Sequence, residues 1–168
     1  MKRLLLVALA CAGLLLNGCA GYRLGSMLPK DIATVYVPTF INATTEPQLE
    51  VETTQALIEE VQRDGSLRVV NKEQADTVLT VTQKGYDLSP VSYRTDQRTA
   101  AREYRITLYA SFLMTRRVSS AVVAESPRVI GEGVFPVTGD LTTSKIRGLP
   151  VAAGALARRI VQQMVEVW

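Results

Sequence analysis

The side chain with the clearest potential for chemistry is the thiol of Cys19, because a cysteine thiolate is a strong nucleophile. It follows a short basic segment, Lys2 and Arg3, and an apolar run over residues 4–16. This pattern is typical of a secretory signal peptide. The run is well short of the roughly 20 residues that span a hydrocarbon core. We therefore expect a segment that directs export and is removed, and not a permanent transmembrane helix.

The residues that precede Cys19 resemble the lipobox of bacterial lipoproteins. Leu16 lies three positions before the cysteine and Gly18 lies directly before it, while Asn17 stands where Ser, Ala or Thr is more usual. The resemblance implies that diacylglycerol is joined to the Cys19 sulfur by a thioether. It also implies that the chain is cleaved before this residue and that the new amino terminus is acylated. Several acyl chains together form a durable membrane anchor.

The same resemblance predicts where the mature protein resides. Ala20, and not Asp, follows the cysteine, which by resemblance to lipoprotein sorting favours the periplasmic side of the cell outer membrane. The alternative is a signal peptide, residues 1–18, that is cleaved before an unmodified Cys19. Cys11 leaves with the signal segment, so no disulfide can form within residues 19–168. The length of this mature chain suits a single domain.

Composition argues against catalysis. The chain has no histidine, so it lacks the usual general base near neutral pH and the commonest zinc ligand. Because the one remaining thiol is expected to carry lipid, Ser-His-Asp and Cys-His mechanisms are excluded. Acidic residues are scattered, and there is no Gly-rich phosphate loop. We therefore predict a protein that is not an enzyme and that needs no cofactor or metal.

The net charge excludes another class of function. Two of the 19 basic residues, Lys2 and Arg3, leave with the signal peptide, and the other 17 stand against 16 acidic residues. A nearly neutral domain has no overall field that attracts nucleic acid. An anionic ligand would therefore have to be held by a local cluster.

Two helices and several strands must position any such cluster. Proline, acidic residues and an apolar stripe predict a helix from about Pro47 to Arg63, with Thr44 or Thr45 as its cap and Asp64-Gly65 as its end. A second helix with a wide apolar face is expected from about Pro150 to the last residue. Richness in β-branched and aromatic residues predicts strands at 32–37, 67–70, 76–86, 102–114 and 129–137.

The best of these strands is 102–114, where apolar and polar residues alternate, so that one face is buried and the other is wet. Residues 71–75 are expected to form a turn or a brief helical excursion, and residues 88–101 a polar connection. Gly131 and Gly133 suggest a bulge or a close backbone approach. The order of elements predicts an α+β two-layer sandwich, with two helices on one face of a mainly antiparallel or mixed sheet.

Several short motifs, taken in order, resemble the LptE family of outer-membrane lipoproteins that help to assemble lipopolysaccharide. Besides the lipobox, they are Gly21-Tyr22-Arg23-Leu24-Gly25, Val35-Tyr36-Val37-Pro38-Thr39-Phe40, Thr54-Gln55-Ala56-Leu57, Leu67-Arg68-Val69-Val70 and Ala75-Asp76-Thr77-Val78-Leu79. The resemblance implies a sheet of about four strands with two helices. It also implies two partners, an LptD-type outer-membrane β-barrel that the protein plugs and lipopolysaccharide itself.

Arginines are the natural partners of the lipid A phosphates. The densest group in the chain is Arg94, Arg98, Arg102 and Arg105, and Arg116, Arg117 and Arg128 form a second one. Two other interpretations remain open for both groups. They could be a solvated edge that discourages strand-to-strand aggregation, or they could contact the polar lumen of a barrel.

One other class of function remains open at this stage. A Pro-Thr-Phe-x-Asn segment after the first strand also occurs in lipoprotein activators and secretion components of the cell envelope, which contact synthases or form pores. The chain has no long linker after Cys19, and a wall-spanning activator would need one.

Overall fold

Six strands and two α-helices form the part of the chain that the computed structural model describes, residues 28–93 and 101–166. The strands are β1 (Thr34–Tyr36), β2 (Ile41–Asn42), β3 (Arg68–Val69), β4 (Thr77–Tyr93), β5 (Ala101–Arg116) and β6 (Val122–Pro136). The helices are α2 (Leu49–Asp64) and α3 (Leu141–Val165), with a short 3₁₀ helix, η1 (Lys72–Gln74), before β4.

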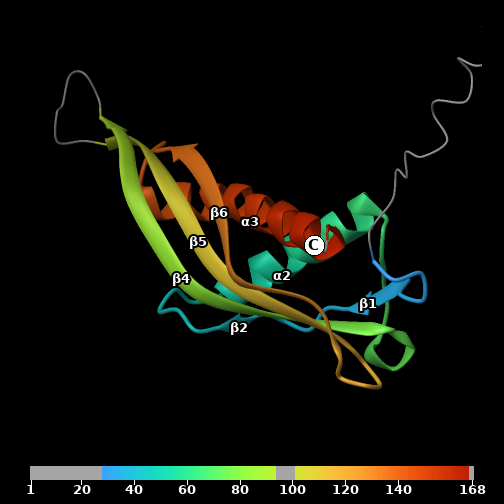
Figure 1. Ribbon diagram of the computed structural model, residues 1–168. Coiled ribbons are helices and arrows are strands. Elements are labelled where there is room, and N and C mark those ends of the chain that lie inside the picture. Colours follow the sequence, from blue (N-terminus) through green and yellow to red (C-terminus); the bar gives the residue numbers. More distant parts are fainter. Residues whose placement is uncertain (1–27, 94–100, 167–168) are drawn as a thin grey trace, which may run out of the picture.

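The strands form one mixed sheet in the order β3-β1-β4-β5-β6, and β2 lies beside β4. β1 pairs in parallel with both β3 and β4, whereas β4, β5 and β6 are antiparallel. Both helices lie on the same side of the curved sheet, and one end of the β4–β5 ribbon projects past them (Figure 1). The predicted α+β sandwich is therefore confirmed, with more strands than the four expected. The excess includes β2, a two-residue pairing within a segment that reads as polar.

The predicted alternation in β5 is also confirmed. Ile106, Leu108, Ala110, Phe112 and Met114 are all buried, and most residues between them are partly or fully exposed. Thr107 is the exception, because it too is buried. These apolar side chains belong to one core cluster, to which both helices contribute.

Two of the long strands, β4 and β6, extend further than their composition indicates. β4 continues to Tyr93, so residues 88–93 are strand and not a polar connection. The reason is cross-strand pairing, since Leu88 lies opposite Ile106 and Pro90 lies opposite Tyr104. β6 likewise begins at Val122, seven positions before its predicted start at Val129.

Helix α2 ends as predicted but begins differently. Gly65 closes it in the left-handed conformation, with φ of 76°, and donates its backbone N–H to Val61. Its cap is not Thr44 or Thr45 but Gln48, which is itself left-handed and makes no side-chain capping bond. Thr44 instead donates its hydroxyl to the side-chain oxygen of Asn42. The side chain that was expected to cap the helix is therefore hydrogen-bonded within the loop.

Helix α3 begins earlier than predicted, and Pro150 lies inside it. The true cap is Asp140, whose carboxylate accepts the backbone N–H of Thr143 at 2.8 Å. Proline is common in the first turn of a helix, and this preference led to the wrong start.

Gly131 and Gly133 allow α3 to lie directly on β6. A Cβ at Gly133 would lie 2.5 Å from the backbone nitrogen of Ala152, and one at Gly131 would overlap the Cβ of Leu156. The close backbone approach predicted for these glycines is confirmed. Side by side, α3 and β6 run antiparallel in space, since Phe135 contacts Gly148 near the start of the helix.

Candidate functional site

The first predicted arginine group is divided by the sheet. Arg94 and Arg98 lie outside the described residues, whereas Arg102 and Arg105 both lie in β5. Successive strand residues point to opposite faces, so the side chains of Arg102 and Arg105 lie on opposite faces of the ribbon. Neither guanidinium makes an ion pair with a residue that the structure describes. Both are therefore available to an anionic partner, but they do not form one cluster.

The second arginine group is dispersed and largely occupied. Arg117 donates its Nε to the Ala75 carbonyl at 2.7 Å. Arg128 lies over the Tyr109 ring, 5.4 Å from its centroid. Arg116 pairs with Asp31, as described below. Each of these three arginines therefore has a partner within the fold. Arg116 and Arg117 line one pocket beside Asp31 and Asp76, whereas Arg128 lies apart from them over Tyr109.

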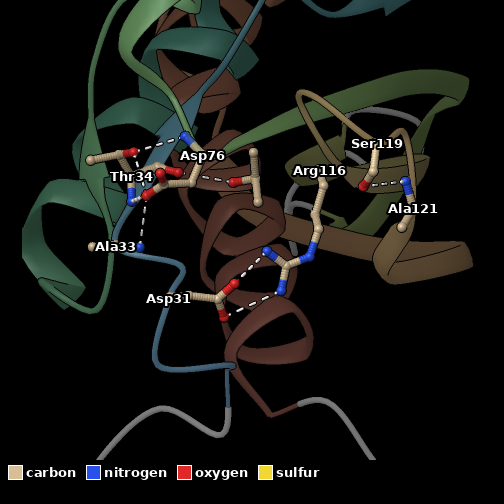
Figure 2. A network of polar contacts seen from close by, with 8 residues as sticks. Asp31, Ala33, Thr34, Asp76, Arg116, Ser119 and Ala121 are labelled. Carbon is tan, nitrogen blue, oxygen red and sulfur yellow. Dashed lines mark hydrogen bonds and ion pairs between the residues drawn. The ribbon is translucent and has the colours of Figure 1, made fainter.

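A polar network around Asp76 joins the start of β1 to the start of β4 (Figure 2). One carboxylate oxygen of Asp76 accepts the backbone N–H groups of Ala33 and Thr34, at 3.0 and 2.9 Å, and the Thr34 hydroxyl at 2.7 Å. The Asp76 N–H in turn donates to the Thr34 hydroxyl at 2.9 Å. The Thr34 hydroxyl and the Ala33 N–H lower the pKa of Asp76 below its ordinary value. At this end of β1 and β4, the side chains of Asp76 and Thr34 thus accept backbone N–H groups in place of a neighbouring strand.

A second contact in the same region is the bidentate pair between Arg116 and Asp31 (Figure 2). The two distances are 2.6 and 3.2 Å, and the hydrogen bond from Arg116 lowers the pKa of Asp31. Arg116 is the last residue of β5, whereas Asp31 lies just before β1. The pair therefore holds the segment before β1 against the end of β5, next to the turn between β5 and β6. Both side chains are solvent-accessible, so its energetic value is small.

A groove of about 630 Å³ lies between the loop before α2 and the first turns of α3. Val51 and Ile146 line it and are 63% and 66% exposed. Leu149 and the ring of Tyr86 add further apolar surface. Exposed apolar side chains around a concave surface are typical of a binding site and not of a bare domain surface.

Charged and polar groups at this groove are arranged around Tyr86. Lys145 pairs with Glu46 at 2.6 Å and lies 5.8 Å from the centroid of the Tyr86 ring. The Tyr86 hydroxyl is buried and has no hydrogen-bond partner among the described residues. Burial raises the pKa of Tyr86 to about 12, so the phenol is neutral at physiological pH. The groove can accept an apolar group beside a cation, but it holds no nucleophile activated by a base.

The sequence did not reveal this groove, because its residues come from three separate segments. Lys145 and Glu46 are 99 positions apart in the chain. The only available signal was the pair of apolar residues, Val51 and Ile146, on what are otherwise the polar sides of two helices.

The predicted lipid anchor lies in a part of the chain that the structure does not describe. Cys19 and the rest of residues 1–27 lie outside the described part of the chain. Within the described part, no helix combines the length and apolar character needed to cross a membrane. Nor do its acidic side chains form a group of three or more that could hold a metal ion.

A family model described as "LptE: Lipopolysaccharide-assembly" matches residues 32–166. The match covers every described strand and helix. Among curated proteins, none matches the sequence.

Solved structures share the fold at low sequence identity. Protein XCC0632 from Xanthomonas campestris is 10% identical, with a TM-score of 0.57 over 85% of this chain and 90% of that one. A subunit of the PelC dodecamer from Paraburkholderia phytofirmans is 13% identical, with a TM-score of 0.51 over 84% of this chain and 93% of that one. At such identities the likeness shows the fold alone.

Proposed function

The chain belongs to the LptE family of lipopolysaccharide-assembly proteins, and from this premise we propose that it plugs an LptD-type β-barrel in the outer membrane. In this role it assists the assembly of lipopolysaccharide into the outer leaflet, without catalysis of its own. The observation that carries the proposal is the family match over residues 32–166.

The uncovered face of the sheet supports a place inside a barrel. Tyr109 and Ser111 of β5 and Glu132 of β6 are among its half-buried or exposed residues. The same face also carries the exposed apolar residues Leu113 and Val134, so it is mixed in character. Its polar members complement the polar lumen of a barrel. The curved ribbon of β4 and β5, which projects past the helices (Figure 1), gives the domain an elongated form suited to a cylindrical space.

We also propose that Cys19 carries the lipid anchor, as the lipobox-like residues before it predict. Only residues 19–27 separate the anchor from the first described residue, Leu28. Even a fully extended chain of this length reaches at most about 30 Å. The domain therefore stays beside the membrane that holds its lipid. Cys19→Ala should abolish incorporation of a palmitate analogue, and labelling that persists would show that the anchor lies elsewhere.

For the ligand, we propose that Arg94, Arg98, Arg102 and Arg105 meet the phosphates of lipid A. Support comes from Arg102 and Arg105, which have no ion-pair partner among the described residues. Because these two lie on opposite faces, each should contribute separately. Charge reversal at either position should weaken lipopolysaccharide binding by about tenfold at low salt.

Arg159→Glu provides a matched control for the ligand test, because Arg159 is an exposed arginine of α3 that makes no ion pair with a residue in the described ranges. Binding is measured by retention of purified lipopolysaccharide, and thermal unfolding shows that each variant remains folded. Equal loss in Arg102→Glu, Arg105→Glu and Arg159→Glu would indicate a general charge effect and would contradict the proposal.

The function as a whole is tested by affinity purification of the native protein from outer membranes. We expect a large β-barrel protein to be recovered in about equal amount. Recovery of the protein alone would contradict the proposal. Recovery with a cell-wall synthase or a secretion pore would instead identify the protein as an envelope activator or secretion component.

A further inference from the structure

The first half of β6 forms an open sheet edge beside a groove. β6 is the last strand of the sheet, and among the described strands it pairs only with β5. A groove of about 410 Å³ follows this edge, between the strand and the last turns of α3. It is lined by residues 122–126 of the strand and by Gln163 and Glu166.

The groove arises from the way α3 crosses β6. At Gly131 and Gly133 the helix lies so close that even a methyl group would overlap Leu156 or Ala152. Toward Val122 a groove lies between residues 122–126 of the strand and Gln163 and Glu166 of the helix end. One wall of the groove is therefore a strand edge and the other is a helix, an arrangement that accepts an added strand.

The two halves of β6 differ in how they are protected. Edge strands normally carry prolines, charges or bulges that prevent pairing with another chain. In β6 the prolines and most of the charges come after residue 126, at Pro127, Arg128, Glu132 and Pro136. Residues 122–126 carry a single charge, Glu125, and an irregularity of register between Val122 and Ala124. The first half begins with Val122, Val123 and Ala124, and Val122 is 57% exposed. Residues 122–126 thus have no proline and fewer charges than the rest of β6, and they are the part of this edge that is less protected against pairing.

The charges that line the groove favour a cationic partner. Its charged lining residues, Glu125 and Glu166, are both acidic. Neither forms an ion pair with a residue that the structure describes. Unpaired carboxylates on the two walls favour a cationic side chain placed between them.

We propose that this groove binds an extended polypeptide segment carrying Lys or Arg, which pairs with Val122–Ser126 as an additional strand. Backbone hydrogen bonds to the β6 edge provide the affinity. Glu125 and Glu166 hold the cationic side chain and thereby set the specificity. The inference concerns a polypeptide partner at the sheet edge and does not depend on how lipopolysaccharide is bound.

The test uses the full mature chain and a short fluorescent peptide that alternates valine with lysine. We expect the peptide to shift the backbone amide resonances of residues 122–126 and to slow their hydrogen exchange. The Glu125→Lys/Glu166→Lys double variant should bind this peptide about tenfold more weakly at low salt. It should also bind a matched valine–glutamate peptide more tightly than the parent protein does.

Glu132→Lys is the matched control, because it changes the same charge on the same strand but lies between the two glycines that α3 covers. Its affinity for the lysine peptide should equal that of the parent. The proposal is overturned if resonances elsewhere shift, if millimolar peptide causes no shift, or if Glu132→Lys weakens binding as much as the double variant. Self-association of the parent through residues 122–126 would also overturn it and would make a second copy the occupant.

Discussion

Asp76 shows how one side chain can join two distant segments. Thr34 and Asp76 are 42 residues apart, and their side chains and backbone groups exchange hydrogen bonds in both directions. Thr34 is buried, at 7% exposure, so its N–H has few alternatives to the Asp76 carboxylate. A hydrogen bond to a charged acceptor is worth more than one to a neutral acceptor.

We predict that Asp76→Ala lowers the free energy of unfolding by about 2 kcal/mol, because it leaves the Thr34 N–H without an acceptor. Asp87→Ala is the control, since Asp87 is an exposed aspartate of β4 whose side chain makes no hydrogen bond with the residues that the structure describes. Urea unfolding at neutral pH measures the difference. Equal effects of the two substitutions would show that the network does not stabilise the fold.

The pH dependence of this prediction follows from the lowered pKa of Asp76. A carboxyl group whose pKa is lower in the folded state stabilises the fold above its unfolded pKa, about 4. That contribution disappears as the pH falls through the folded pKa. The difference in stability between Asp76→Ala and the parent should therefore be constant from neutral pH down to about 5 and should shrink below about 4.

Gln83 is a polar residue that is buried in the core. It is fully buried in β4, and neither Nε2 nor Oε1 has a hydrogen-bond partner among the described residues. An unpaired buried amide destabilises a fold. Gln83→Met, which keeps the shape and removes the polar atoms, should raise the free energy of unfolding by about 1 kcal/mol.

Thr53 provides the comparison for Gln83, because it is equally buried but its hydroxyl donates to the Leu49 carbonyl at 2.8 Å. Thr53→Val should therefore give no comparable gain. If Gln83→Met destabilises the protein, the amide has a partner of its own in solution, such as an ordered water.

At the scale of elements, sequence pattern predicted what depends on local periodicity. The alternation in β5 and the stop at Gly65 needed only neighbouring residues, and both are confirmed. The start of α3 and the length of β4 depended on contacts made across space. The predictions of a helix start at Pro150 and of a polar connection from residue 88 were wrong for that reason. The groove around Lys145 and Glu46 could not be predicted, since no local pattern joins residues 99 positions apart.

The junction of α3 and β6 gives a prediction at this scale. Gly131→Ala should lower the free energy of unfolding by more than about 2 kcal/mol, because its methyl group would overlap Leu156 and push the helix from the strand. Gly154 lies in α3 itself, where a new Cβ would meet the guanidinium of Arg158 at 3.6 Å, an ordinary van der Waals contact.

The second glycine is therefore a control with the opposite expected sign. Alanine is favoured over glycine inside a helix by about 1 kcal/mol, so Gly154→Ala should stabilise the protein. Thermal unfolding of both variants measures the two changes in stability. A small effect at Gly131 would mean that the helix can move aside without loss of packing.

Across the whole molecule, stability should be unevenly distributed along the two longest strands. Residues 77–83 of β4 lie between β5 and the strands β1 and β2, whereas residues beyond Gln83 pair only with β5 among the described strands. Amides of residues 86–93 should therefore exchange with solvent on the order of a hundredfold faster than those of residues 77–83. Hydrogen exchange followed by mass spectrometry measures this, and uniform protection along β4 would contradict it.

The place of β1 in the sheet bears on how the protein reaches its destination. β1 lies between β3 and β4, and both pairings are parallel, with Val35 opposite Val69 on one side and Thr77 on the other. Parallel partners are separated by a crossover and form late. A chain translocated amino end first presents β1 long before either partner emerges. We therefore expect the early residues to remain extended and accessible to chaperones, so that folding completes only after the β4–β5–β6 ribbon has crossed the inner membrane.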